Sequence, residues 1–176
     1  FMAKMKQWQT PKSFMLPSNT HIGAWFMPED IVDDICEYWD NPPEHIQKKQ
    51  PGGVVTKKDG VESYGINRNI KDSTDLYISE GDYSPPWGQY HALLQACLES
   101  YMKSYPESGW TEKFLIKGRF NVQKYEKGGG YKTWHFENTG DESEVHRHLV
   151  FMTYLNDVPD GGTMFKYQNI TVPAIK

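Results

Sequence analysis

The spacing of apolar residues changes partway along the chain, and this change limits the fold more than any other feature. Up to about residue 110 apolar side chains recur every three to four residues, as they do on a helix. From Phe114 onward they alternate with polar ones, which is typical of strands. Helices followed by short strands predict an α+β fold. The form we expect is a β-sandwich or jelly roll with N-terminal helices packed on one face.

Two segments of the first half carry the helical spacing. Over residues 28–39, Ile31, Ile35 and Trp39 recur every four residues behind a helix-initiating Pro28. A second helix is predicted from residues 84–86 to about residue 105. Its apolar stripe comprises Trp87, Tyr90, Leu94, Cys97 (or Leu98) and Tyr101. Residues 41–60, rich in proline and glycine, are predicted to form a long connection.

The second half contains short β-type runs separated by glycine-rich or polar turns. These predicted strands cover residues 115–125, 147–156, 162–167 and 170–174. In the first of them Phe120 and Val122 point to one face, whereas Asn121, Gln123 and Tyr125 point to the other. The polar face lies either in solvent or along a wet pocket inside a barrel.

Length and composition narrow the class of protein. A chain of 176 residues predicts one domain over residues 1–176, with a helical part over 1–110 and a jelly-roll part over 111–176. Its 8 Phe, 6 Trp and 11 Tyr favour a packed core over disorder, and a net charge of −4 argues against a nucleic-acid partner. Without a membrane-length apolar run or a secretory signal, a cytoplasmic location is expected. Cys36 and Cys97 are predicted to be free thiols.

One histidine and one acid form a candidate metal site. His135 and Glu137 are two residues apart, so in an extended segment both side chains project to the same face and can bind one metal ion. None of the other five histidines has an acid at this offset. The motif is short, so its interpretation depends on the surrounding sequence.

The residues on both sides of this pair follow a recognisable order. Upstream, Tyr125 leads through a turn of three glycines, 128–130, to Tyr131. Downstream, Arg147 begins a segment that ends in Tyr154-Leu155-Asn156 and precedes Gly161-Gly162-Thr163-Met164-Phe165. In this order the chain resembles the prolyl-4-hydroxylase-like branch of the 2-oxoglutarate- and iron(II)-dependent oxygenases. The resemblance spans residues 120–173 and is strongest to phage and marine microbial members.

The resemblance implies an activity and a set of site residues. The enzyme would hydroxylate a prolyl or similar side chain, in a peptide or small-molecule substrate, while 2-oxoglutarate is decarboxylated to succinate. It would use iron(II) and 2-oxoglutarate, with ascorbate as a further candidate cofactor. The implied metal ligands are His135 and Glu137, although many relatives have Asp at the second position. The implied 2-oxoglutarate ligands are Tyr125 and Tyr154, and the implied pocket-mouth or substrate residues are Tyr131 and Arg147.

Two site residues that the resemblance implies are not found within residues 1–176. The family's distal histidine ligand and the basic residue that pairs with 2-oxoglutarate are expected beyond Lys176, which predicts a jelly roll that is incomplete at its C-terminus. An exposed sheet edge there would let copies of the chain pair. His146 and His148 are weaker candidates for the third ligand, and Arg147 reads equally well as a solvated charge. Two alternatives stay open: a catalytically inactive jelly-roll module for binding or assembly, and a cupin-type metal enzyme that uses no keto acid.

Overall fold

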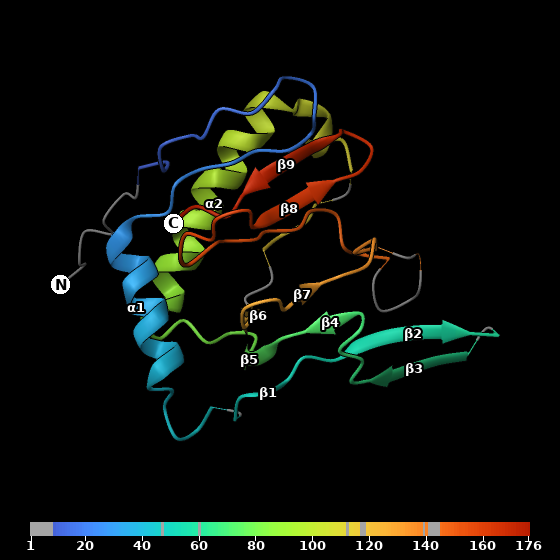
Figure 1. Ribbon diagram of the computed structural model, residues 1–176. Coiled ribbons are helices and arrows are strands. Elements are labelled where there is room, and N and C mark those ends of the chain that lie inside the picture. Colours follow the sequence, from blue (N-terminus) through green and yellow to red (C-terminus); the bar gives the residue numbers. More distant parts are fainter. Residues whose placement is uncertain are drawn as a thin grey trace. The chain divides into compact units, whose positions relative to one another are not determined.

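The computed structural model describes residues 9–46, 48–59, 61–111, 113–116, 119–138, 140 and 145–176 (Figure 1). The chain forms two compact units, each assembled from segments that are distant in sequence. The first unit contains the chain up to Asp40 together with Tyr83–Ile116 and Phe151–Lys176, and the second contains Asn41–Asp82 and Lys117–Val150. Within the described residues there are two α-helices and four small antiparallel sheets, which confirms the predicted α+β class. The jelly roll itself stays a prediction.

The two α-helices lie in the first unit and match the predicted ones. Helix α1 is Glu29–Asp40, helix α2 is Trp87–Ser104, and a 3-10 helix, η1, follows at Pro106–Gly109. Helices α1 and α2 lie next to each other (Figure 1). The rings of Tyr38 and Trp87, one from each helix, pack edge to face with centroids 5.1 Å apart. The predicted stripes are buried at Ile31, Ile35, Trp87, Tyr90, Leu94, Cys97 and Leu98. None of the described helices is long and apolar enough to cross a membrane.

Two predicted strands of the first unit form a hairpin. Strands β8 (Gly162–Phe165) and β9 (Ile170–Pro173) pair antiparallel, with Thr163 opposite Val172. Both cysteines are free, as predicted, Cys97 being buried and Cys36 half-buried. Burial raises the pKa of Cys97 to about 11, so this thiol stays protonated and unreactive at neutral pH.

The predicted strand over residues 147–156 is wrong. All ten residues are described, and none belongs to a strand. The carbonyl oxygens of Arg147 and Leu155 accept hydrogen bonds from side chains, Asn138 Nδ2 at 3.0 Å and Cys36 Sγ at 3.9 Å. The segment also passes from the second unit into the first between Val150 and Phe151. A sequence that favours extended backbone becomes a strand only where another strand lies alongside.

The second unit is built around a three-stranded sheet in the order β1-β5-β6. Its strands are β1 (Gln50–Pro51), β5 (Thr74–Ile78) and β6 (Phe120–Lys124), so β6 is shorter than predicted. The central strand β5 was not predicted from the sequence. Leu76 and Ile78 are fully buried opposite Val122 and Phe120, on the face predicted to be apolar. The polar face of β6 was also predicted correctly.

Two further strand pairs complete the second unit. Strands β2 (Val54–Lys58) and β3 (Val61–Gly65) form a hairpin inside and just beyond the stretch predicted as a long connection. Asp59, which directly follows β2, has a positive φ of 52°, which suits a tight hairpin turn. Strands β4 (Lys71–Asp72) and β7 (Gly130–Tyr131) pair antiparallel, with Lys71 opposite Tyr131.

The absence of a side chain at Gly52 allows β1 to approach β5, and its replacement gives a stability prediction. In Gly52→Ala the new Cβ would lie 2.1 Å from Ser73 Oγ and 2.9 Å from Asp75 Oδ1. We expect the free energy of unfolding to fall by about 1–3 kcal/mol, because buried polar groups must move apart. Gly65→Ala is the control, because no atom lies within 4 Å of its added Cβ, and a change within about 0.5 kcal/mol is expected there. Urea denaturation of both variants checks this, and equal midpoints would contradict it.

Candidate functional site

A short strand pair places the first aromatic residue of the candidate site. After β6 the chain turns back, with the Gly129 N–H donating to Glu126 O at 2.7 Å and Gly128 at a φ of 82° that favours glycine. Tyr131 in β7 then lies opposite Lys71 in β4. The next residue continues the pairing, because the Lys132 N–H donates to Ile70 O at 2.7 Å. Tyr131 is therefore anchored by backbone hydrogen bonds on β4.

The side chains of His135 and Glu137 converge. The His135 ring stacks on Tyr131 with a centroid distance of 3.8 Å and an interplanar angle of 20°. Its Nδ1 lies 3.1 Å from Thr133 O, and its Nε2 lies 3.3 Å from Glu137 Oε1. Residues 132–137 are not a strand, so the reason given in the sequence analysis, strand alternation, does not apply. A bent segment, supported by Tyr131, brings the two side chains together instead.

Arg147 contacts the carboxylate of this pair. Its Nη1 donates to Glu137 O at 3.0 Å and lies 3.4 Å from Glu137 Oε2. Asn138 Nδ2 donates to Val145 O at 3.3 Å and to Arg147 O at 3.0 Å. Asn138, which follows Glu137 in the sequence, thus holds the main chain at Val145 and Arg147 close to Glu137 through these two hydrogen bonds. Sequence reasoning did not single out Asn138, which carries no chemistry of its own.

A buried charged network lies on β4 and β5 in the same unit. Asp75 is fully buried, and Lys71 is 5% exposed, with Lys71 Nζ at 2.6 Å from Asp75 Oδ2. The carboxylate also accepts from Ser73 Oγ at 2.6 Å, Asn121 Nδ2 at 3.0 Å and Tyr77 OH at 3.3 Å. Four donors thus satisfy the hydrogen-bonding capacity of one buried carboxylate and hold it in place. The alternation of polar residues at 71, 73, 75 and 77 was the signal that could have revealed it.

Tyr125 belongs to the polar face next to this network. Its hydroxyl donates to Gln123 Oε1 at 2.7 Å. Burial, followed by the negative charge of Asp75 and the neighbouring Tyr131, raises the pKa of Tyr125 to about 12. The phenol is therefore protonated at neutral pH and serves as a hydrogen-bond donor.

Tyr154 lies in the first unit, whereas the other five predicted site residues lie in the second. Its hydroxyl is 2.6 Å from Thr163 Oγ1 and 3.5 Å from Val172 O, so it contacts the β8–β9 hairpin. Burial raises the pKa of this phenol as well. The hydroxyl of Tyr154 thus has hydrogen-bond partners within its own unit.

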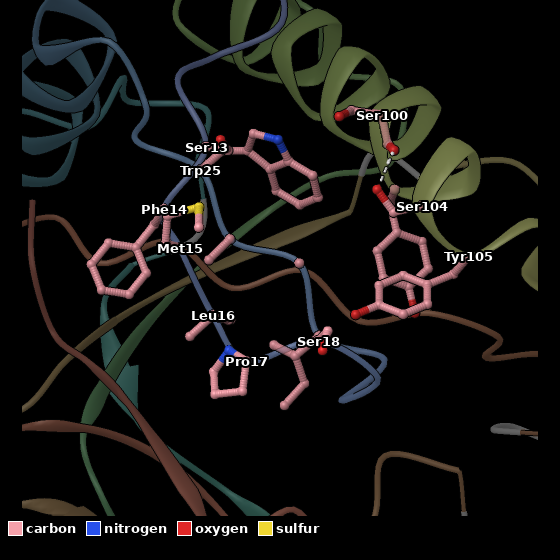
Figure 2. Close-up of a pocket in the computed structure, with 14 residues that line it drawn as sticks. Ser13, Phe14, Met15, Leu16, Pro17, Ser18, Trp25, Ser100, Ser104 and Tyr105 are labelled. Atoms are coloured by element: carbon pink, nitrogen blue, oxygen red, sulfur yellow. Dashed lines mark hydrogen bonds between the residues drawn. The ribbon is translucent and has the colours of Figure 1, made fainter.

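The first unit has a surface cavity of about 280 Å³ between the N-terminal segment and α2 (Figure 2). Trp25 and Tyr105 supply aromatic walls, and Ser100 and Ser104 lie on the α2 side. Among the described residues that line it there is no histidine, cysteine, acid or base. The cavity therefore offers neither metal ligands nor carboxylate or imidazole groups for acid–base catalysis.

His135 and Glu137 remain the strongest chemical feature. Among the residues that the structure describes, no group of three or more His, Cys, Asp or Glu side chains gathers where it could hold a metal ion. The pair therefore offers two protein ligands. Comparisons of the sequence with family models and curated proteins, and of the fold with solved structures, give no match.

Proposed function

We propose that this protein is a 2-oxoglutarate- and iron(II)-dependent oxygenase that hydroxylates a prolyl or similar side chain, built on a double-stranded β-helix. One observation carries the proposal: His135 Nε2 and Glu137 Oε1 lie 3.3 Å apart with the other ring nitrogen facing a carbonyl oxygen. The motif order around the pair, from Tyr125 to Phe165, supports the choice of iron and a keto acid over other metal chemistry.

The distance between the two side chains fits a shared metal ion. Metal–nitrogen and metal–carboxylate bonds are each about 2.0–2.2 Å long, so two neighbouring ligands at a right angle lie about 3 Å apart. The separation of 3.3 Å between His135 Nε2 and Glu137 Oε1 is close to this value. If Nδ1 carries the proton that it shares with Thr133 O, the lone pair of Nε2 faces the carboxylate. Metal-binding histidines commonly have this arrangement.

The chain's own residues would hold and orient the reacting groups. His135 and Glu137 would bind iron(II), and Tyr131 stacks on the imidazole and restricts its rotation. Tyr125, protonated at neutral pH, would donate a hydrogen bond to the anionic cosubstrate. Lys71 is neutralised by Asp75, so it is not assigned to the cosubstrate carboxylate. Bound iron(II) and 2-oxoglutarate would supply the oxidising chemistry.

The experiment is an anaerobic titration of the protein with iron(II) and then 2-oxoglutarate. We expect the weak visible charge-transfer band of a metal-chelated keto acid, followed by succinate release once oxygen and a peptide substrate are added. Iron binding without this band would favour a cupin-type enzyme, which should retain zinc or manganese. An absence of metal binding would favour the inactive binding or assembly module, because the pair would then be a surface ion pair.

A further inference from the structure

We infer that the surface cavity of the first unit is a binding site for one ring of a neutral sugar, either a free monosaccharide or the terminal residue of a glycan. The shared chemistry is a six-membered ring with hydroxyl groups around its edge and an apolar C–H face. The inference does not depend on the proposed metal centre, because the described residues that line the cavity all lie in the first unit and none is a predicted metal ligand.

One wall of the cavity is a loop of the N-terminal segment, and hydrogen bonds hold this loop at two places. At its base, the Phe14 N–H donates to Ala24 O at 2.8 Å. Farther along, the Tyr101 hydroxyl of α2 donates to His21 O at 2.9 Å, which fixes the loop on the helix. A wall that is already in place lowers the cost of ordering on binding.

Aromatic rings form the apolar part of the lining. The Trp25 indole packs against Gly23, where an added Cβ would collide with the indole and would lie 3.0 Å from the Tyr101 ring. The rings of Tyr101 and Tyr105, four residues apart on the chain, have centroids 4.9 Å apart. Figure 2 shows Trp25 and Tyr105 on different sides of the open space. Such rings offer flat surfaces on which the C–H face of a sugar can pack.

Hydroxyl groups form the polar part of the lining, and four of them come from Ser13, Ser18, Ser100 and Ser104. Ser104 Oγ donates to Ser100 O at 3.4 Å and keeps its lone pairs available as acceptors. The hydroxyls of Ser13, Ser18 and Ser100 have no hydrogen-bond partner in the part of the chain that the structure describes. Because a hydroxyl both donates and accepts, these groups match the hydroxyls of a sugar.

The charge and the size of the cavity select the ligand class. No Lys, Arg, His, Asp or Glu is among the described lining residues, so a charged ligand would lose hydration without gaining an ion partner. A wholly apolar ligand would instead leave serine hydroxyls without water or a partner. The volume of about 280 Å³ is near the lower end of the range for small-molecule sites, which suits one ring and not a longer chain.

The test is saturation-transfer difference NMR with glucose, galactose, mannose and N-acetylglucosamine, each free and at the non-reducing end of a disaccharide. We expect at least one of these sugars to bind with a Kd of about 1 mM, because a ligand with so few atoms gains little binding free energy. Tighter binding of the free sugar identifies a monosaccharide as the ligand, whereas equal or tighter binding of the disaccharide identifies the end of a glycan.

Two variants with matched controls locate the binding. Ser104→Tyr should abolish saturation transfer, because Ser104 is an exposed lining residue and a larger side chain there fills the cavity. Lys103→Tyr is its control, at the neighbouring exposed position of α2 outside the lining. Trp25→Leu should weaken binding about 2- to 10-fold through loss of the aromatic surface. Its control is Trp110→Leu, because Trp110 is 83% exposed and does not line the cavity.

The inference fails if none of the sugars shows saturation transfer. It fails equally if the wild type and Ser104→Tyr bind alike, because the sugar would then bind elsewhere. Glucuronate and a proline-rich peptide are the comparison ligands, since aromatic grooves also bind such peptides, and tighter binding of either would overturn the ligand class. Urea denaturation checks the fold of each variant, and should Trp25→Leu not fold, the comparison of Ser104→Tyr with Lys103→Tyr decides. No metal is added, so failure here leaves the proposed function untouched.

Discussion

Replacing Lys71 by methionine is expected to lower the stability of the second unit by about 3 kcal/mol, because it leaves the buried Asp75 carboxylate without its charge partner. Methionine has a similar volume, so packing changes little. The donors Ser73, Tyr77 and Asn121 remain and keep the loss near the lower end of the range for broken buried pairs. Urea denaturation, together with hydrogen exchange at the β5 and β6 amides, measures the change where it should occur.

Arg68→Met is the matched control for this prediction. Arg68 and Asp72 form an ion pair with the same four-residue spacing as Lys71 and Asp75, but their side chains are 62% and 33% exposed. A surface pair contributes about 0–1 kcal/mol, so the control should be close to the wild type in stability. Equal losses of unfolding free energy in the two variants would mean that burial does not determine how much the Lys71–Asp75 pair stabilises the fold.

His135→Ala is expected to reduce iron(II) or manganese(II) affinity by about 100-fold or more. Removing a hydrogen-bond partner of a ligand already costs about 10–100-fold, so removing the ligand itself should cost at least the upper value. Because 39% of the His135 side chain is exposed, the fold should tolerate its removal. Isothermal titration calorimetry under anaerobic conditions measures the affinity, and urea denaturation checks the fold.

His45→Ala is the control for general effects of losing an exposed imidazole. His45 is exposed in the second unit and has no acid two residues away, so metal affinity should be unchanged. An equal loss in both variants would point to adventitious binding by surface histidines. No loss in His135→Ala would refute the metal centre and support the inactive-module alternative.

Local patterns in the sequence determined the helices and part of the sheet. The four-residue spacing of Ile31 and Ile35 and the stripe that begins at Trp87 predicted α1 and α2 correctly. Alternation predicted the two faces of β6 and the strands β8 and β9. In each case the signal lies within one segment, because the period of a helix or strand is set by its own backbone geometry.

Other elements were missed or wrong because their partners lie elsewhere in the chain. Strand β5 contains Asp75, whose charge is compatible with a buried strand only because Lys71, Ser73 and Asn121 surround it. The hairpin of β2 and β3 was hidden by the surrounding prolines and glycines, although the Asp59-Gly60 dipeptide was a usable turn signal. Residues 147–156 favour extended backbone, but no described segment pairs with them as a strand.

In the candidate site, too, some features follow from the sequence and others depend on the fold. The sequence by itself determined that His135 and Glu137 are two residues apart and that Tyr125 shares a polar face with Gln123. Only the tertiary structure decided that the side chains of His135 and Glu137 converge on a bent segment, that Arg147 contacts the second oxygen of Glu137, and that Lys71 pairs with Asp75. Spacing along a chain fixes which residues can share a face, whereas the partner of a charged side chain depends on segments brought together by folding.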